Sequence, residues 1–262
     1  MPRTARKNIT TPYIHIMVQG IRKEYIFRKE IYKKEYLKLL NNAAKDEKGI
    51  IILAYCIMDN HAHILVYTEN IEILSNIMQK TNSAYGVFYN QKEHREGYVF
   101  KNRYKAQIIG TQKHLYTAFA YIHNNPVKAN MVKKLNQYKY SSYNLYKSNK
   151  INKKCIKLLF GTDNYHYKFD IMHKKIADLK IMDIEEELPS KGEIKSFLDE
   201  YIKKQKISME EIKKNNFLIM KISNKLKEKY FINDSEIAYM LGIGKNRIRR
   251  IKKSNGEKNL RP

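Results

Sequence analysis

Tryptophan is absent from the 262-residue sequence, cysteine occurs only twice and proline five times. Cys56 and Cys155 lie far apart, so the chain lacks the disulfide framework of small secreted domains, a pattern typical of a reducing compartment. The basic start, residues 1–7, has no apolar core of the kind found in signal peptides, and no apolar run is long enough to span a membrane. We therefore expect a cytoplasmic protein that does not associate with membranes.

Acidic residues are also scarce: 26 Asp and Glu stand against 51 Lys and Arg, which gives a formal net charge of +25. Residues 101–150 hold ten basic and no acidic side chains, and residues 201–262 hold 17 basic against 6 acidic ones. Part of the excess reflects a general preference for lysine over arginine, but basic blocks are typical of proteins that bind a nucleic acid. A basic membrane surface is the competing interpretation, and no segment shows the amphipathic helix that it requires.

A pair of histidines, His61 and His63, flanks one small apolar residue at the head of an apolar run that is typical of a β-strand. Side chains at i and i+2 of a strand project from the same face, about 7 Å apart along the chain, so both imidazoles can face one divalent metal. Asp59 and Asn60 form a turn after a second apolar run, which predicts a hairpin with the pair on its second strand. The alternative is that the two histidines are simply polar residues on one face.

A helical pattern runs from about Gln112 toward Pro126, and the residue before a proline is pushed out of the α region. The pattern therefore predicts a helix that ends near Asn124 or Asn125. Tyr121 and Asn125 are four residues apart and share a face of this helix. If that face lies over the histidine pair, a phenol meets two imidazoles and one amide oxygen. If it does not, Tyr121 simply packs and Asn125 caps the helix.

Hydrophobic periodicity predicts an α+β fold for the first part of the chain. The expected order is β-α-β-β-α-β with a final helix, which is typical of a ferredoxin-like antiparallel sheet with helices on one face. The expected strands are 12–19, 50–58, 61–68 and 98–109, and the expected helices are 30–48, 71–90 and 112–124.

The composition changes after residue 146, so we expect a first domain over residues 1–146, a connecting segment over 147–190 and an all-α domain over 191–262. In the last of these, Ser235 is expected to cap a short helix that ends at Gly242, and a helix over about 217–230 precedes it. A turn and a second basic helix follow, a pattern typical of a helix-turn-helix whose second helix enters the major groove. Its expected DNA contacts are Lys245, Arg247, Arg249 and Arg250. An ordinary αα-hairpin with a basic face is the alternative.

Several motifs follow one another in order and spacing within residues 8–146: Tyr13 to Gly20, Ile26 to Arg28, Met58 to Leu65, Gly97 to Lys105 and Tyr121 to Ala129. This succession resembles the single-tyrosine transposases of the His-hydrophobic-His superfamily, in particular the REP-associated tyrosine transposases. Two positions depart from the family pattern. Asp59 stands where relatives often have proline, and Lys101-Asn102 where they often have Gln-Gly.

The resemblance implies that Tyr121 is the catalytic tyrosine, that His61 and His63 are metal ligands, and that Asn125 is the third ligand. It further implies cleavage and strand transfer on single-stranded DNA with hairpin or palindromic repeats, through a 5′-phosphotyrosine intermediate. Imidazole and oxygen ligands together suit Mn²⁺ or Mg²⁺ as the divalent metal. We expect further DNA contacts from Lys101, Arg103, Lys105 and Lys128. Members of the family differ in whether an active site is built within one chain or between two, so a homodimer is one expected assembly.

Other functions are compatible with the same elements. A non-catalytic regulator could keep the fold to bind DNA hairpins, although a decayed copy would be expected to lose at least one of His61, His63, Tyr121 and Asn125. An RNA-binding module would use aromatic side chains on the sheet for stacking, and no clear set of them stands out. Replication initiators and relaxases share the metal site but differ more in the order of their motifs.

Overall fold

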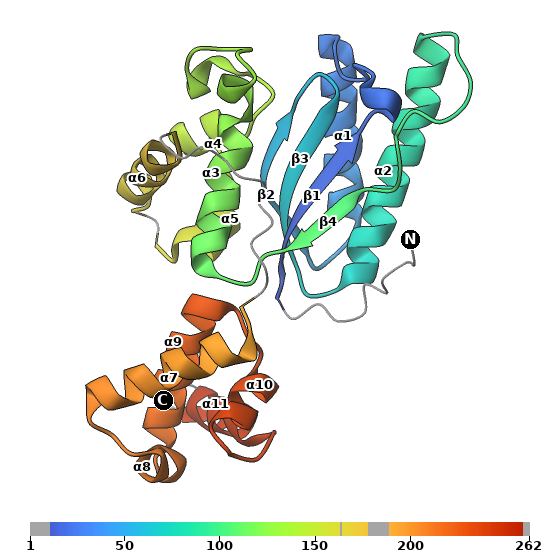
Figure 1. Cartoon of the computed structure of the whole chain (residues 1–262). Coiled ribbons are helices and arrows are strands. Elements are labelled where there is room, and N and C mark those ends of the chain that lie inside the picture. Colours follow the sequence, from blue (N-terminus) through green and yellow to red (C-terminus); the bar gives the residue numbers. More distant parts are fainter. Residues whose placement is uncertain (1–10, 163, 178–188, 259–262) are drawn as a thin grey trace. The chain divides into compact units, whose positions relative to one another are not determined.

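A computed structural model describes residues 11–162, 164–177 and 189–258 (Figure 1). The chain divides into two compact units, the first formed by residues 1–109 with 114–185 and the second by residues 110–113 with 186–262. In the part of the chain that the structure describes, no helix combines the length and the apolar character needed to cross a membrane.

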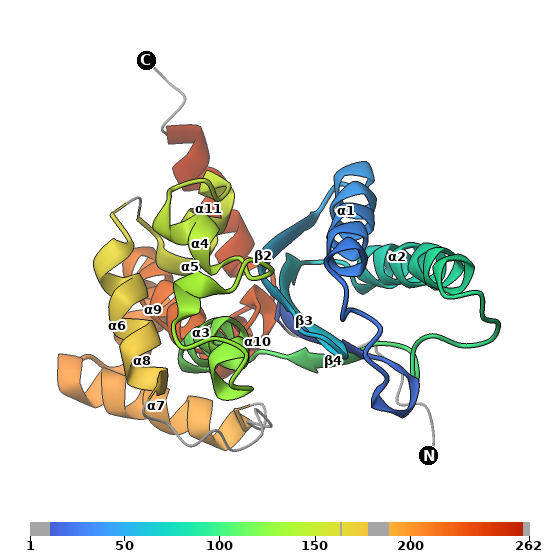
Figure 2. The ribbon, with the colours of Figure 1, turned by 90° about the horizontal axis from the view of Figure 1, so that it is seen from above.

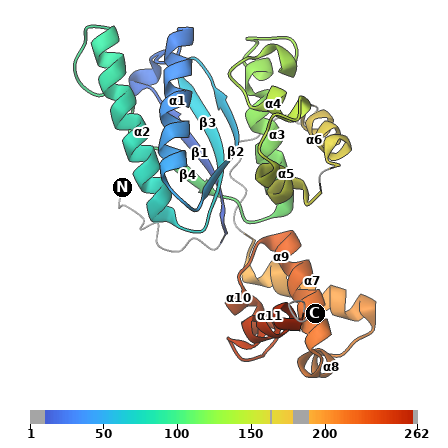
Figure 3. The ribbon, with the colours of Figure 1, turned by 180° about the vertical axis from the view of Figure 1, so that it is seen from behind.

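The first unit is built on a four-stranded antiparallel sheet with the strand order β2-β3-β1-β4. Its strands are β1 (Tyr13–Gln19), β2 (Ile50–Ile57), β3 (His61–Thr68) and β4 (Lys105–Ile108). Two long helices, α1 (Glu30–Asp46) and α2 (Ile71–Lys92), lie side by side over one face, as seen from behind in Figure 3. This arrangement confirms the predicted α+β class and the antiparallel sheet.

Strand alternation divides the side chains of the sheet between its two faces. Ile14, Ile16 and Val18 of β1, together with Ala62, Ile64 and Val66 of β3, are buried and share the face that α1 and α2 cover. The opposite face carries the residues between them, and α3 (Gln112–Lys128) and α5 (Lys153–Phe160) lie on that side (Figure 2). The candidate functional residues of β3 therefore face α3.

Two predicted boundaries need correction. The strand expected over 98–109 is regular only from Lys105, because the charged run 101–103 has no apolar alternation and remains an exposed loop. The helix expected to end before Pro126 continues to Lys128. A proline so near a helix end removes only one hydrogen bond, and the chain beyond it re-forms bonds from Ala129 N to Asn125 O and from Met131 N to Pro126 O.

The segment 147–190, predicted as a connection, is largely folded into the first unit. A short helix α4 (Tyr143–Lys147) is followed by α5 and α6 (His166–Ala177). In α5, Cys155, Ile156, Leu159 and Phe160 form one buried face while lysines cover the other. The prediction rested on the high lysine content of this segment. The fraction of polar residues does not tell which face of a helix each residue occupies, so the helical period was missed. Residues 178–188 of that segment lie outside the described residues.

Helix α3 is held from behind by an aromatic cluster and by a chain of buried hydrogen bonds. Phe119 of α3 packs against Tyr146 and Phe169, with ring centroids 5.0 and 5.9 Å apart respectively. His123 Nε2 lies 2.8 Å from Ser142 Oγ, and its Nδ1 lies 2.9 Å from His173 Nε2. This series of hydrogen bonds ends with the bond that His173 Nδ1 donates to Phe169 O at 2.7 Å. Every ring nitrogen in it has a partner while both imidazoles stay neutral.

The second unit contains five helices among its described residues, α7 (Lys191–Gln205), α8 (Met209–Lys214), α9 (Asn216–Tyr230), α10 (Asp234–Met240) and α11 (Arg247–Lys258). They share one apolar core that includes Ile219, Leu226, Ile237 and Ile248. The predicted cap Ser235 is wrong. Asn233 caps α10, and its side-chain oxygen accepts from the backbone N–H groups of Ser235 and Glu236.

The buried histidine pair predicts a loss of stability in mild acid. Burial lowers the pKa of His173 to about 4 and holds the pKa of His123 well below its ordinary value. Below about pH 6.5 the unfolded chain takes up protons that the folded chain refuses, so the free energy of unfolding falls as the pH drops toward 4. Each such histidine contributes up to about 1.4 kcal/mol per pH unit in that window.

Urea unfolding at several pH values between 7.5 and 4.5 measures this dependence. His173→Gln should flatten it, whereas His94→Gln, a change at an exposed position, should leave the slope as it is. Equal slopes for His173→Gln and the unchanged chain would contradict the assignment.

Candidate active site

The turn before β3 positions the histidine pair. The carboxylate of Asp59 accepts from Lys33 Nζ at 2.6 Å, and Lys33 is only 6% exposed. The carbonyl of Asp59 accepts from Phe27 N at 2.8 Å. Asp59, the residue that departs from the family pattern, thus ties the turn to α1 and to the segment before it.

His61 and His63 project from the same face of β3, with ring centroids 4.9 Å apart. His61 Nδ1 lies 2.6 Å from Asn60 Oδ1, and since that oxygen only accepts, the proton sits on Nδ1. Asn60 is held in this orientation by a bond from its Nδ2 to Lys23 O at 3.4 Å. The Nε2 atom of His61 is therefore the nitrogen that carries a lone pair for a ligand.

His63 is almost fully buried, and its Nδ1 lies 2.9 Å from Nε2 of His15 on β1. Burial lowers the pKa of His61, of His63 and of His15, the last to about 4. The neighbouring imidazoles lower the pKa of His63 further. The three rings are consequently neutral near pH 7, and a neutral imidazole is the form that binds metals.

Helix α3 brings Tyr121 to these rings. The centroid of the phenol ring lies 5.5 Å from that of His63 and 6.4 Å from that of His15, in both cases with the planes nearly perpendicular. The tyrosine is only partly buried. The structure thus brings together Tyr121, His61 and His63, the side chains that the sequence pattern singled out.

Two further residues of α3 lie along the same face as Tyr121. Asn125 is 8% exposed and its Nδ2 donates to Tyr121 O at 2.9 Å, so its side-chain oxygen is the atom that it can offer to a ligand. The ammonium of Lys128 lies 5.6 Å from the centroid of the Tyr121 ring, and burial lowers its pKa. A cation in this position stabilises negative charge on the phenol.

Lys101, Arg103 and Lys105 are exposed in the loop before β4 and at its first residue. Lys101 N donates to Gln19 O at 2.9 Å, and Gln19 pairs with His61 in the sheet. Lys105 lies opposite Met17, which pairs with His63, so Lys105 stands on the same face as the histidines. These cations are suited to hold a phosphate backbone beside the site.

Lys245, Arg247, Arg249 and Arg250 belong to the second unit. Lys245 lies in the turn between α10 and α11, and Arg247 begins α11 and donates to Asn216 Oδ1 of α9 at 3.2 Å. Arg249 and Arg250 are exposed, while Ile248 and Ile251 of the same helix are buried. Helix α11 therefore presents its charges on the side away from the helical core.

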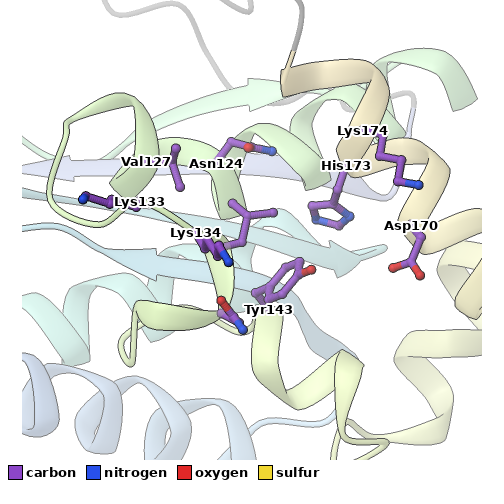
Figure 4. A pocket seen from close by; sticks show the side chains of 10 residues that line it. Asn124, Val127, Lys133, Lys134, Tyr143, Asp170, His173 and Lys174 are labelled. Carbon is purple, nitrogen blue, oxygen red and sulfur yellow. The ribbon is translucent and has the colours of Figure 1, made fainter.

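A cavity of about 530 Å³ opens on another flank of α3 (Figure 4). Its lining includes Asn124 and Val127 of α3, Tyr143 of α4, and Asp170, His173 and Lys174 of α6. None of Tyr121, His61 and His63 lines it, and the ring nitrogens of His173 already have partners. The cavity is thus separate from the arrangement around Tyr121.

Within the described ranges, no group of three or more His, Cys, Asp or Glu side chains is arranged to hold a metal ion. The donor set around Tyr121 is of another kind, two neutral imidazoles and an amide oxygen. Its chemistry fits a divalent ion of intermediate character such as Mn²⁺, and Mg²⁺ less well. His61, His63 and Asn125 are the residues that would hold such an ion.

Three residues of this arrangement were missed by sequence reasoning, namely His15, Asn60 and Gln107. His15 alternates with the buried Ile14 and Ile16 of β1 and so lies on the opposite face, but only the strand register tells which residues of β3 it meets. Gln107 lies directly opposite His15 in the ladder between β1 and β4 and hydrogen bonds to its side chain. An isolated strand pattern carries no information on register, so these partners became visible only in the structure.

Comparison with known proteins gives three findings. Residues 8–125 match the family model described as IS200-like transposase. The structure of a REP-associated tyrosine transposase bound to a REP hairpin is similar, with 16% identity over 58% of this chain and 88% of that chain and a TM-score of 0.46. A Deinococcus radiodurans R1 protein described as a transposase aligns at 12% identity over 44% of this chain and 91% of its own, with a TM-score of 0.33.

Among curated proteins the chain has no match. The family model covers β1 to β4 and reaches along α3 as far as Asn125, and so includes His61, His63 and Tyr121. The match to the IS200-like transposase model spans residues 8–125, which is less than half of the 262-residue chain.

Proposed function

We propose that this protein is a transposase, a metal-dependent single-stranded DNA endonuclease and strand transferase that acts through a 5′-phosphotyrosine on Tyr121. The observation that carries the proposal is the position of the Tyr121 ring, 5.5 Å from His63 and on the face of β3 from which His61 also projects. A partly exposed nucleophile beside imidazoles that can hold an activating metal is suited to phosphodiester cleavage.

In the proposed reaction, the phenol oxygen of Tyr121 attacks the scissile phosphorus. A bond forms between this oxygen and phosphorus, the bond from phosphorus to the 3′ oxygen breaks, and the leaving 3′ oxygen takes up a proton. A divalent ion held by His61, His63 and Asn125 would polarise the phosphate and offset the charge on its oxygens. The ammonium of Lys128 favours the phenolate during attack. A second 3′-hydroxyl reverses the step on the phosphotyrosine, so the phosphodiester bond is conserved without a nucleotide cofactor.

The proposed substrate is single-stranded DNA that carries hairpin or palindromic repeats. Lys105 on β4 and Lys128 on α3 supply cations on the side of the sheet where Tyr121 lies, and Lys101 and Arg103 are exposed in the loop before β4. Such contacts fix the strand but carry no sequence information. We assign base recognition to the second unit, in which α10 and α11 would act as a helix-turn-helix with Lys245, Arg247, Arg249 and Arg250 toward DNA.

Tyr121→Phe removes the nucleophilic oxygen and keeps the ring that packs on His63. It should abolish the covalent adduct with labelled single-stranded hairpin DNA in Mn²⁺ and leave DNA affinity within about twofold, because phosphate contacts supply most of that affinity. Denaturing gels measure the adduct and filter binding measures the affinity. Tyr116→Phe on the same helix is the matched control and should form the adduct normally. An adduct that persists in Tyr121→Phe would assign the nucleophile elsewhere, and no adduct in the unchanged chain would favour a hairpin-binding regulator.

His61→Ala and His63→Ala should each lower Mn²⁺-dependent cleavage by about 100-fold or more, since the stabilisation of charge on the phosphate is lost. His166→Ala, at a half-buried position of α6 outside the site, is the control and should cleave at the normal rate. Cleavage is followed on an end-labelled strand with increasing Mn²⁺ and after chelation. Full activity in the presence of chelator would refute the role of the metal.

Arg249→Gln combined with Arg250→Gln should weaken binding to hairpin-bearing and unrelated DNA alike where the contacts are to phosphates, and reduce the slope of log affinity against log salt by about one per lost contact. Where the arginines read bases, the loss is confined to the preferred site. Lys203→Gln with Lys204→Gln on α7 removes the same charge from exposed positions of the same unit. Equal effects of both pairs would mean that α11 has no special role in DNA binding.

A further inference from the structure

We infer that His15 is a positioning residue that fixes the proton of His63 on Nδ1 and so directs the Nε2 lone pair of His63 toward a divalent cation. This inference deepens the proposed function and rests on the metal-binding role assigned there to His61 and His63. The inference adds a third histidine, which lies on another strand. His15 would contact neither the scissile phosphate nor the cation.

The strand register places His15 for this role. In the ladder between β1 and β3, Met17 pairs with His63 and His15 pairs with Leu65, so His15 lies one pair further along on the same face. From there its Nε2 reaches His63 Nδ1 at 2.9 Å, and the two rings are stacked with an interplanar angle of 20°. His15 is 7% exposed and His63 4%, so water does not compete for this bond.

The proton in this bond belongs to one ring or the other, and only one choice leaves His63 able to bind a cation. If His15 donates, His63 carries its own proton on Nε2 and has no lone pair to offer there. If His63 donates from Nδ1, its Nε2 is free for the cation. A bound cation and the hydrogen bond from His15 are thus compatible only in the second tautomer.

Gln107 is placed to suit that second tautomer. It lies opposite His15 on β4 and hydrogen bonds to the His15 side chain, and its amide oxygen can accept a ring proton. With His15 Nε2 bonded to His63, the proton that Gln107 accepts is the one on His15 Nδ1. The neutral ring of His15 then presents Nε2 as an acceptor, and the order of donation runs from His63 to His15 to Gln107.

His61 reaches the same tautomer by a different route. Its Nδ1 donates to Asn60 Oδ1 at 2.6 Å, which leaves Nε2 as the ligating atom. The two imidazoles of the pair are therefore both protonated on Nδ1 and both present Nε2, one through an amide in the turn and one through a ring on the next strand. Groups that orient metal-binding histidines in this way commonly change metal affinity by about 10-fold to 100-fold when they are removed.

The test uses two substitutions in the full chain. His15→Leu removes the acceptor and keeps an apolar side chain in a buried position. His15→Gln places an amide oxygen near the position of Nε2 and should rescue the effect. Long-range ¹H–¹⁵N spectra of the metal-free protein report the His63 tautomer, and Mn²⁺ titration followed by electron paramagnetic resonance reports the affinity. Thermal unfolding is recorded for both variants so that any general loss of folding is seen.

We expect the unchanged chain and His15→Gln to hold His63 in the Nδ1–H tautomer and to bind Mn²⁺ with affinities within a few-fold of each other. His15→Leu should populate the other tautomer and bind Mn²⁺ about 10-fold to 100-fold more weakly. A His63 proton on Nε2 in the unchanged chain would overturn the inference, and so would an unaltered tautomer and affinity in His15→Leu.

The metal-binding role of His61 and His63 and the positioning role of His15 can be contradicted separately. If the unchanged chain binds no Mn²⁺, the metal role in the proposed function is lost, and so is the purpose assigned to His15, whatever the tautomer. If it binds Mn²⁺ and His15→Leu binds it equally well, the proposed function stands and only the positioning role falls.

Discussion

The antiparallel pairing of β1 with β3 is the constraint on which the candidate site depends. Its register sets Gln19 against His61 and Met17 against His63, and so brings His15 within hydrogen-bond distance of the second ring. Because side chains alternate between the faces of a sheet, a slip of one residue would turn both histidines toward α1 and α2. The buried isoleucines and valines of the other face hold the register, so the apolar core specifies the position of the polar site.

The second half of the site depends on parts of the chain that the family model does not cover. Tyr121 and His123 lie two residues apart on α3 and point to different sides of it. Tyr121 meets the sheet, whereas His123 is bonded to Ser142 and His173, and Phe119 packs into the aromatic cluster of α4 to α6. Helices beyond residue 125 thereby fix the rotation of α3 about its axis, which decides whether the phenol faces the imidazoles.

Sequence patterns sufficed for features that depend on local periodicity. The first three strands, the helices on one face and the proximity of Tyr121 to the histidine pair follow from alternation and from family motifs. The predictions that were wrong concern features that depend on the surrounding structure. Pro126 is tolerated because it sits in the last turn of α3, and the lysine-rich segment around Cys155 folds because its few apolar residues share a face. His15 and Gln107 needed the register, which no single strand encodes.

The ionisable side chains of this protein fall into two groups, buried neutral imidazoles and exposed charged residues. The imidazoles near Tyr121 are neutral because they are buried, so they contribute no net charge toward a phosphate. The net charge of +25 resides on other, mostly exposed side chains such as Lys101, Arg103 and Lys105. Exposed charges are screened by salt, whereas buried contacts are screened far less. Under the proposed function, salt therefore governs how much DNA is held, while the rate of cleavage of the DNA that is held depends on the geometry that the sheet and α3 enforce.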